Sequence, residues 1–242
     1  HFKVHSQYSI CEGALKIENL SNFCKTNKIR AIGLSDTSNL CGALEFSENI
    51  SKSGTKPILG TQINFKFSDV IGLLPIIAKT ENGYKTMINL SSKSFLDSDG
   101  LNPPYCKIDD LLNLSDDIIL FSGSINGLFG TLFDKGKFDE LNLLYKKLKN
   151  KFKDDFYIEI QRHNDINEKS FEKFNLKKSH DFKIPIIATN EVYYINKTMH
   201  NAHDALICIK NKTYINEKNR VKFNDQHYFK DSSEMSKLFS DL

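Results

Sequence analysis

Several polar and ionisable residues of this chain follow short apolar segments, at points where β-strands are expected to end. They are His5, Asp36, Gln62, Ser124, His163 and Glu191. Side chains in such positions often carry the chemistry of an α/β protein. A hydrolytic metal centre needs several His, Asp and Glu ligands that converge and leave one position open to water. Together with Glu12, the ionisable members of this set are enough for one metal ion but few for two or three. The competing interpretation is that they cap loops and form hydrogen bonds at strand ends.

Other chemistries have less support in the sequence. The glycine-rich stretch 122–130 matches neither GxGxxG nor GxxxxGK[ST], and its Gly, Asn and Ser residues favour a strand-to-helix turn. No GxSxG motif occurs, and no cysteine stands in a recognisable nucleophile sequence. Tyr193 and Tyr194 could stack on bases. Beside the β-branched Val192, however, such rings more often belong to the core or to a pocket wall.

Composition excludes some classes of protein. The 242 residues carry a net charge of +3, which is too weak a basic balance to predict nucleic-acid binding. The five cysteines form no CxxC pair, so neither a structural zinc site nor a disulfide framework is expected, and a reducing cytoplasm fits. No apolar run is long enough to span a bilayer, and no signal peptide is recognisable. Because the chain starts at His1 rather than Met, we expect it to be a fragment of a longer protein.

Apolar runs and helical periodicity alternate along the chain. Strands are expected at 31–34, 56–63, 70–78, 117–121, 156–160 and 184–189. Helices are expected at 14–28, 43–48, 81–95, 108–114, 137–151, 166–180 and 199–209. A loop is expected at 97–107, and Pro75 favours an edge strand or a bulge for the strand that contains it. The inward side chains of the helix at 81–95 are expected to be Tyr84, Met87, Ile88 and Leu90.

This rhythm of strand, loop and helix predicts an α/β protein with a parallel sheet, either a barrel or a doubly wound sheet. No break in composition and no internal repeat divides the chain, so residues 1–242 are expected to form a single domain. In a barrel the loops that follow the strands all meet at one face, which would bring the polar residues together.

Short motifs also occur in an order that resembles one known family. They are residues 4–9 (VHSQYS) with 12–13 (EG), 34–36 (LSD) with 39–42 (NLCG), 56–60 (KPILG), 82–84 (NGY) with 90–92 (LSS), 119–123 (ILFSG) and 188–194 (ATNEVYY). Together they are similar to the PHP (polymerase and histidinol phosphatase) domain of bacterial DNA polymerase III alpha subunits, and the likeness covers nearly the whole chain. Residues 225–239 resemble the stretch just before the palm of such polymerases. The resemblance implies a distorted parallel (β/α) barrel of seven strands, TIM-like in form. It also implies that residues 1–242 are the amino-terminal PHP domain of a longer polymerase subunit.

The resemblance further implies where the family holds its metal ions. The family pattern has histidines at positions 3, 5 and 37, an acid at 12, a glutamate at 62, and Asp and His at 191 and 193, with less securely aligned His and Cys positions at 95 and 124. At these positions the chain has Lys3, His5, Thr37, Glu12, Gln62, Glu191, Tyr193, Phe95 and Ser124. An amide does not replace a carboxylate as an anionic ligand, and an ammonium group repels metal ions. No metal ion and no catalytic residue are therefore expected in the domain, and His5, Glu12 and Glu191 are vestigial.

For the longer protein the resemblance implies DNA-directed DNA polymerase activity, with Mg²⁺ at catalytic residues beyond Leu242. The domain is then expected to support the polymerase core and to bind the proofreading exonuclease subunit, while primer–template DNA is bound through the full-length protein. One alternative is a metal-dependent phosphoesterase or 3′–5′ proofreading nuclease with a reduced metal site. Its candidate residues are His5, Glu12, Asp36, His163 and Glu191. A second alternative is an unrelated barrel phosphatase that acts on small molecules.

Overall fold

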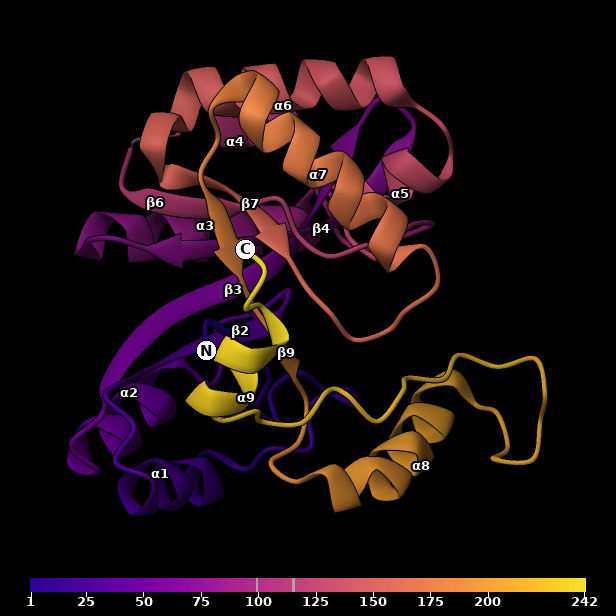
Figure 1. The fold of residues 1–242 in the computed structure, drawn as a ribbon. Helices are drawn as coiled ribbons and strands as arrows, with labels where there is room; N and C mark the ends of the chain where they lie inside the picture. The colour runs from indigo at the N-terminus through magenta and orange to yellow at the C-terminus, as the bar shows by residue number, and fades with distance from the viewer. Residues whose placement is uncertain (99, 115) are drawn as a thin grey trace.

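The computed structural model describes residues 1–98, 100–114 and 116–242 and shows a curled β-sheet with helices on both sides (Figure 1). Its strands are β1 (Lys3–Val4), β2 (Ala31–Thr37), β3 (Lys56–Phe67), β4 (Val70–Ala78), β5 (Cys106–Lys107), β6 (Ile118–Phe121), β7 (Phe156–Ile160), β8 (Ile186–Ala188) and β9 (Glu191–Val192). Across the sheet their order is β8-β7-β6-β4-β3-β2-β1-β9, and β5 pairs with β3. The expected α/β class with a barrel-like sheet is confirmed, but the described residues form nine strands rather than the seven expected.

The helices cover the two faces of this sheet. They are α1 (Ile17–Thr26), α2 (Ala43–Lys52), α3 (Glu81–Leu96), α4 (Ile108–Leu112), α5 (Leu128–Asp134), α6 (Phe138–Phe152), α7 (Glu168–Phe182), α8 (His200–Asn211) and α9 (Ser232–Leu238), with short 3-10 turns at Lys153–Asp155 and Lys197–Met199. In Figure 1, α6 and α7 lie above the sheet, α1 and α2 lie below it, and α8 projects to the lower right. Within the described residues, no helix is both long and apolar enough to cross a membrane.

Strand β4 departs from the expected parallel arrangement. It runs antiparallel to both of its neighbours, β3 and β6, whereas the other strand pairs among the described residues are parallel. The cause is the two-residue link from β3 to β4, in which Ser68 has φ 54°, because so short a link can only join antiparallel strands. The edge position expected from Pro75 is wrong, since β4 lies inside the sheet. Pro75 lies one residue outside the β4–β6 pairing, which begins at Ile76.

The core consists of two apolar clusters. The larger contains side chains of β3, β4 and β6 with those of α5 and α6, and the smaller contains β1 and β2 with α1 and α2. The expected inward face of α3 is only partly correct, because Met87 and Leu90 are buried while Ile88 is 41% exposed. Residue 88 stands about 100° around the helix from residue 87, on the side that faces away from the sheet.

The segment after β9 forms an extension from the barrel. It comprises α8 and a long loop that leads to α9 (Figure 1). Helix α9 was not expected from the sequence, although Asp231 and Glu234 form a capping box at its start. The expected loop at 97–107 includes residue 99, which lies outside the described residues, and it ends in the short strand β5.

Candidate functional site

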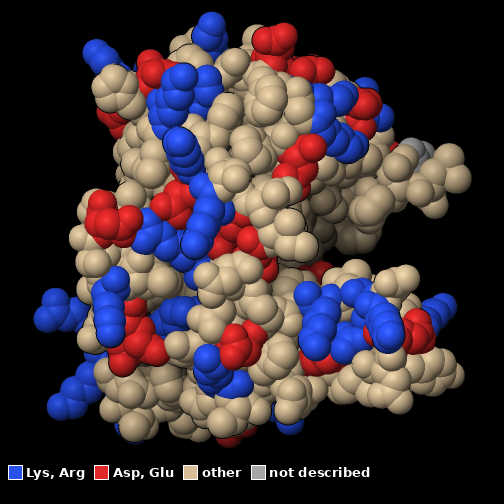
Figure 2. Space-filling model, turned by 45° about the vertical axis from the view of Figure 1, so that its right-hand side comes forward, with Lys and Arg blue, Asp and Glu red and all other residues tan. Residues whose placement is uncertain are grey.

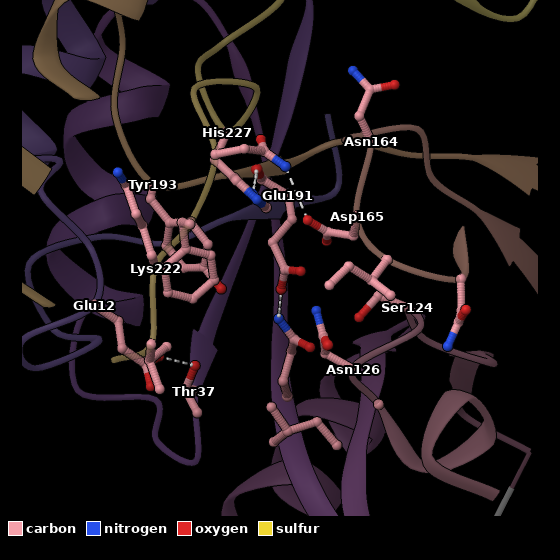
Figure 3. Close-up of a pocket in the computed structure, with 18 of the residues that line it drawn as sticks. Glu12, Thr37, Ser124, Asn126, Asn164, Asp165, Glu191, Tyr193, Lys222 and His227 are labelled. Atoms are coloured by element: carbon pink, nitrogen blue, oxygen red, sulfur yellow. Dashed lines mark hydrogen bonds between the residues drawn. The ribbon is translucent and has the colours of Figure 1, made fainter. Parts of the chain in front are cut away.

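A cavity of about 610 Å³ lies where the chain leaves β2, β6 and β7 (Figure 3). Its walls come from segments far apart in the sequence, among them 124–127, 164–167 and 221–224. The ionisable residues that line it are Glu12, Asp134, Asp165, Glu191, Tyr193, Lys222 and His227. Figure 2 shows Lys and Arg side chains gathered on the lower right of the molecule, beside a recess in its surface. Of the polar residues expected to converge at one face of the barrel, Gln62, Ser124 and Glu191 line this cavity.

Behind this cavity, Lys3 of β1 places an ammonium group between two carboxylates. Its Nζ lies 3.4 Å from Oε1 of Glu159 on β7 and 3.4 Å from Oε1 of Glu191 on β9, and all three residues are buried. Burial by itself would lower the pKa of Lys3, but the two carboxylates outweigh this effect and the net pKa is raised. Lys3 therefore favours its charged form inside the barrel.

Glu191 is the hub of the polar network. Besides Lys3, its Oε1 meets the amide of Gln62, which donates at 2.7 Å, and Nε2 of His5 at 3.1 Å. Burial would raise the pKa of Glu191, but Lys3, His5 and Gln62 together hold that pKa well below its usual range. The ring of His5 stacks on buried Tyr193 at 4.6 Å, which confirms that this tyrosine is a wall residue. His5 and Glu191 are thus in contact, as a shared site requires.

Asp36, a candidate catalytic residue of the hydrolytic alternative, instead holds a turn of the backbone. Its carboxylate accepts hydrogen bonds from the backbone N–H of Ser6 and from the hydroxyls of Ser6 and Ser9, each at 2.7 Å. It thereby fixes the turn that follows His5. Glu12 accepts a 2.7 Å bond from the hydroxyl of Thr37 and pairs with a lysine of α8. Both acids are therefore engaged in holding loops.

Whereas His5 contacts the side chain of Glu191, His163 contacts its backbone. Its Nε2 accepts a hydrogen bond from the backbone N–H of Glu191 at 3.2 Å, and its Nδ1 lies 3.6 Å from Oε1 of Glu168. His163 therefore does not join His5 in one group of possible ligands. It lies close to Asp165 and His227. One potential ligand atom from each of these three residues lies within 4.8 Å of the others.

Reasoning from the sequence missed several members of this region. Glu159 gave a signal, since it is the one charged residue in the apolar strand β7. Asp165 gave a weaker signal, because it follows His163 at spacing two. His227 was not considered as a ligand because it follows no strand, and it reaches the site through the long loop after α8.

Comparison with known proteins identifies the family. Residues 1–163 match the PHP domain. The chain belongs to the PHP domain family. It is 34% identical over 255 residues to the DNA polymerase III subunit alpha of Caulobacter vibrioides and 35% identical over 243 residues to that of Rickettsia felis. These matches cover 100% of this chain but 22% and 20% of the relatives, so the chain spans about a fifth of their length. A crystal structure of a Bifidobacterium adolescentis protein assigned as a metal-dependent phosphoesterase superposes with a TM-score of 0.48 and 12% identity, over 78% of this chain and 86% of that one.

The side chains of this PHP domain do not fit the multinuclear metal centre of the family pattern. At the position of the first family histidine, the Lys3 ammonium lies against the carboxylate that an ion would need. At the position of the family glutamate, Gln62 donates a hydrogen bond to that same oxygen. A metal ion bound to Glu191 would therefore face two groups that present hydrogen atoms rather than lone pairs. Thr37 and Tyr193 offer hydroxyl groups where the pattern has imidazoles.

Proposed function

We propose that this PHP domain belongs to a bacterial DNA polymerase III alpha subunit and is itself non-catalytic. The observation that carries the proposal is the buried Lys3 ammonium, 3.4 Å from both Glu159 and Glu191. A positive charge in this position repels the cations that a PHP hydrolase needs. The identity of 34% and 35%, over the whole of this chain, to alpha subunits of two bacterial genera supports the assignment to this polymerase.

The phosphoesterase alternative has less support. Of its candidate residues, His5 and Glu191 are in contact, but Asp36 accepts three hydrogen bonds from the Ser6–Ser9 turn and His163 contacts the backbone of Glu191. These residues do not surround one open position at which a metal-bound water could attack a phosphate.

The test for hydrolysis uses a generic phosphodiester and a mismatched primer end, each with Mn²⁺ or Zn²⁺. We expect no metal-dependent turnover above that of a heat-denatured sample. The matched variant is His5→Ala, which removes the side chain shared by every version of the hydrolytic site. Turnover that disappears in His5→Ala, or two metal ions bound at His5 and Glu191 in a soaked crystal, would contradict the non-catalytic role.

In the longer protein we propose that the domain supports the polymerase core and binds the proofreading exonuclease subunit, in the cytoplasm. The polymerase reaction, its Mg²⁺ ions and its contacts with primer–template DNA belong to the part of the protein beyond Leu242. A barrel that keeps its scaffold while losing its ligands supports such a docking role. The test compares co-elution of the exonuclease subunit with the full alpha subunit and with a subunit lacking residues 1–242. We expect co-elution only with the former, and equal binding by both would exclude the docking role.

A further inference from the structure

A second set of ligand types lies in the same cavity but outside the positions of the family's metal pattern. His163 and Asp165 come from the loop after β7, and His227 comes from the segment before α9. Asp165 and His227 both line the cavity (Figure 3). One potential ligand atom from each of the three residues lies within 4.8 Å of the others.

His227 is oriented as a ligand would be. It is 2% exposed, and its Nδ1 lies 3.2 Å from the backbone carbonyl of Glu191, so this nitrogen carries the proton and donates it. The lone pair is then on Nε2, which is buried and has no hydrogen-bond partner within the described part of the chain. Histidines that bind metal ions almost always donate their other ring N–H to a carbonyl or carboxylate in this way. A buried, unpartnered acceptor is otherwise unfavourable, and a bound ion would relieve it.

Asp165 supplies the anionic oxygen. The side-chain amide of Asn224 donates to its Oδ1 at 2.9 Å and orients the carboxylate. Within the described residues, its second oxygen takes part in no hydrogen bond and is available to an ion. Ligating carboxylates are commonly held by such a second hydrogen bond.

The third ligand requires a small movement. The rings of His163 and His227 stack at a centroid distance of 4.2 Å with only 8° between their planes. An ion lying in the plane of one ring cannot lie in the plane of the other, so one ring must turn for both to bind. The bond that His163 would give up is the 3.2 Å contact with the N–H of Glu191, which is at the long limit for a hydrogen bond. Such a rotation would free the Nε2 of His163 for a Zn–N bond, which is typically about 2.0–2.1 Å long.

We propose that His163, Asp165 and His227 form a binding site for one divalent transition-metal ion of the Zn²⁺ class. Two imidazoles and one carboxylate suit zinc and related ions, whereas Mg²⁺ and Ca²⁺ prefer sites made of oxygen alone. The fourth coordination position faces the cavity. The ion joins the loop after β7 to the chain that returns from α8, and so fastens the extension to the barrel.

The test is a zinc titration of the full-length protein that contains this domain, after removal of bound metal with a chelator. We expect His227→Gln and Asp165→Asn each to bind one equivalent of Zn²⁺ fewer, or to bind it at least tenfold more weakly, than the unchanged protein. Substituted Co²⁺ should give visible d–d absorption that both variants lose, and Mg²⁺ should not compete. Asp165→Asn keeps the shape of a residue that is only partly buried, so it tests the site even where His227→Gln fails to fold.

Two control variants separate this site from other histidines. His180→Ala removes a histidine side chain that is 93% exposed on α7, and His5→Ala removes the vestigial ligand of the family site. Both should leave the zinc equivalent in place. Absence of the extra zinc equivalent, or its persistence in both His227→Gln and Asp165→Asn, overturns the inference and leaves the proposed function intact. Loss of that equivalent in His5→Ala, with His227→Gln unaffected, overturns the inference and also contradicts the vestigial state of the family site.

Discussion

Replacing Lys3 by methionine removes the cation between Glu159 and Glu191 but keeps an unbranched side chain of similar length. Two buried carboxylates then face each other without their ammonium partner. Removing one partner of a buried ion pair typically costs about 3–5 kcal/mol of unfolding free energy, because the remaining charge is left desolvated. The apolar stem of methionine limits any cavity, so most of this cost should be electrostatic. We therefore expect Lys3→Met to lower the free energy of unfolding of the 242-residue chain by about 3–5 kcal/mol at pH 7.5.

The cost should also depend on pH. In the unchanged protein the pKa of Glu191 is held well below its unfolded value, so its contribution to stability is present above that value and is lost only as the pH falls through the depressed pKa. Without Lys3, burial dominates and the pKa of Glu191 rises above its unfolded value. The native variant then takes up a proton on acidification before the unfolded chain does. As the pH falls from the raised pKa of Glu191 towards its unfolded value, the stability of Lys3→Met relative to the unchanged protein should improve by about 1.4 kcal/mol per pH unit.

The assay is urea unfolding at several pH values, with the midpoint and the slope fitted separately. The control is Lys79→Met, which breaks the surface pair with Asp155 and should cost at most about 1 kcal/mol. The variant that also carries Glu159→Gln and Glu191→Gln should recover at least half of the loss, because no unpaired charge remains. A loss below about 1 kcal/mol for Lys3→Met that does not change with pH would refute the reasoning.

Three further substitutions test individual contacts of the fold. Gly130 lies in a helix, where alanine is intrinsically favoured over glycine by up to about 1 kcal/mol. In Gly130→Ala, however, the added Cβ would lie 1.9 Å from the carbonyl oxygen of Ile125, so we expect a lower midpoint of urea unfolding. A higher midpoint would contradict this packing. Asp36→Asn places an N–H₂ group against hydrogen-bond donors and should lower the free energy of unfolding, measured with urea, by about 1–3 kcal/mol. No change beyond experimental error would show that the turn after β1 does not depend on this acid. Arg220→Met removes the bidentate ion pair with Asp204 and should speed proteolytic cleavage in the loop after α8. An unchanged cleavage rate would show that other contacts hold that loop.

The elements with strong periodicity were predictable from the sequence. Helix α6 buries Leu141, Leu144, Tyr145 and Leu148 as its spacing predicts, because an apolar stripe at helical period has one way to face the core. The reversal of β4 was not predictable in the same way. Its apolar run is compatible with either strand direction, and the turn that decides the direction contains Ser68 rather than the usual Gly or Asn at positive φ.

The candidate site was predictable only in part, for a related reason. Residues that follow strands, such as His5, are brought together by the topology of a barrel, so their proximity follows from the fold. His227 arrives by a long irregular loop whose path no periodicity encodes. The role of Lys3 could be anticipated as a repulsive charge from its type and position. Its pairing with Glu159 depended on the curvature that brings β1 opposite β7, which spacing along the chain does not reveal.

The buried ammonium of Lys3 has a consequence for how the barrel acquires its charge balance. A metal ion has to be captured from the surroundings after synthesis, and it can be lost again to a chelator or during starvation for that metal. The ammonium group of Lys3 is attached to the chain by covalent bonds, so it is delivered in a fixed one-to-one ratio and cannot dissociate. The repulsion between the carboxylates of Glu159 and Glu191 is therefore offset by the single Lys3 charge as soon as the strands come together. This part of the barrel is thereby independent of metal supply.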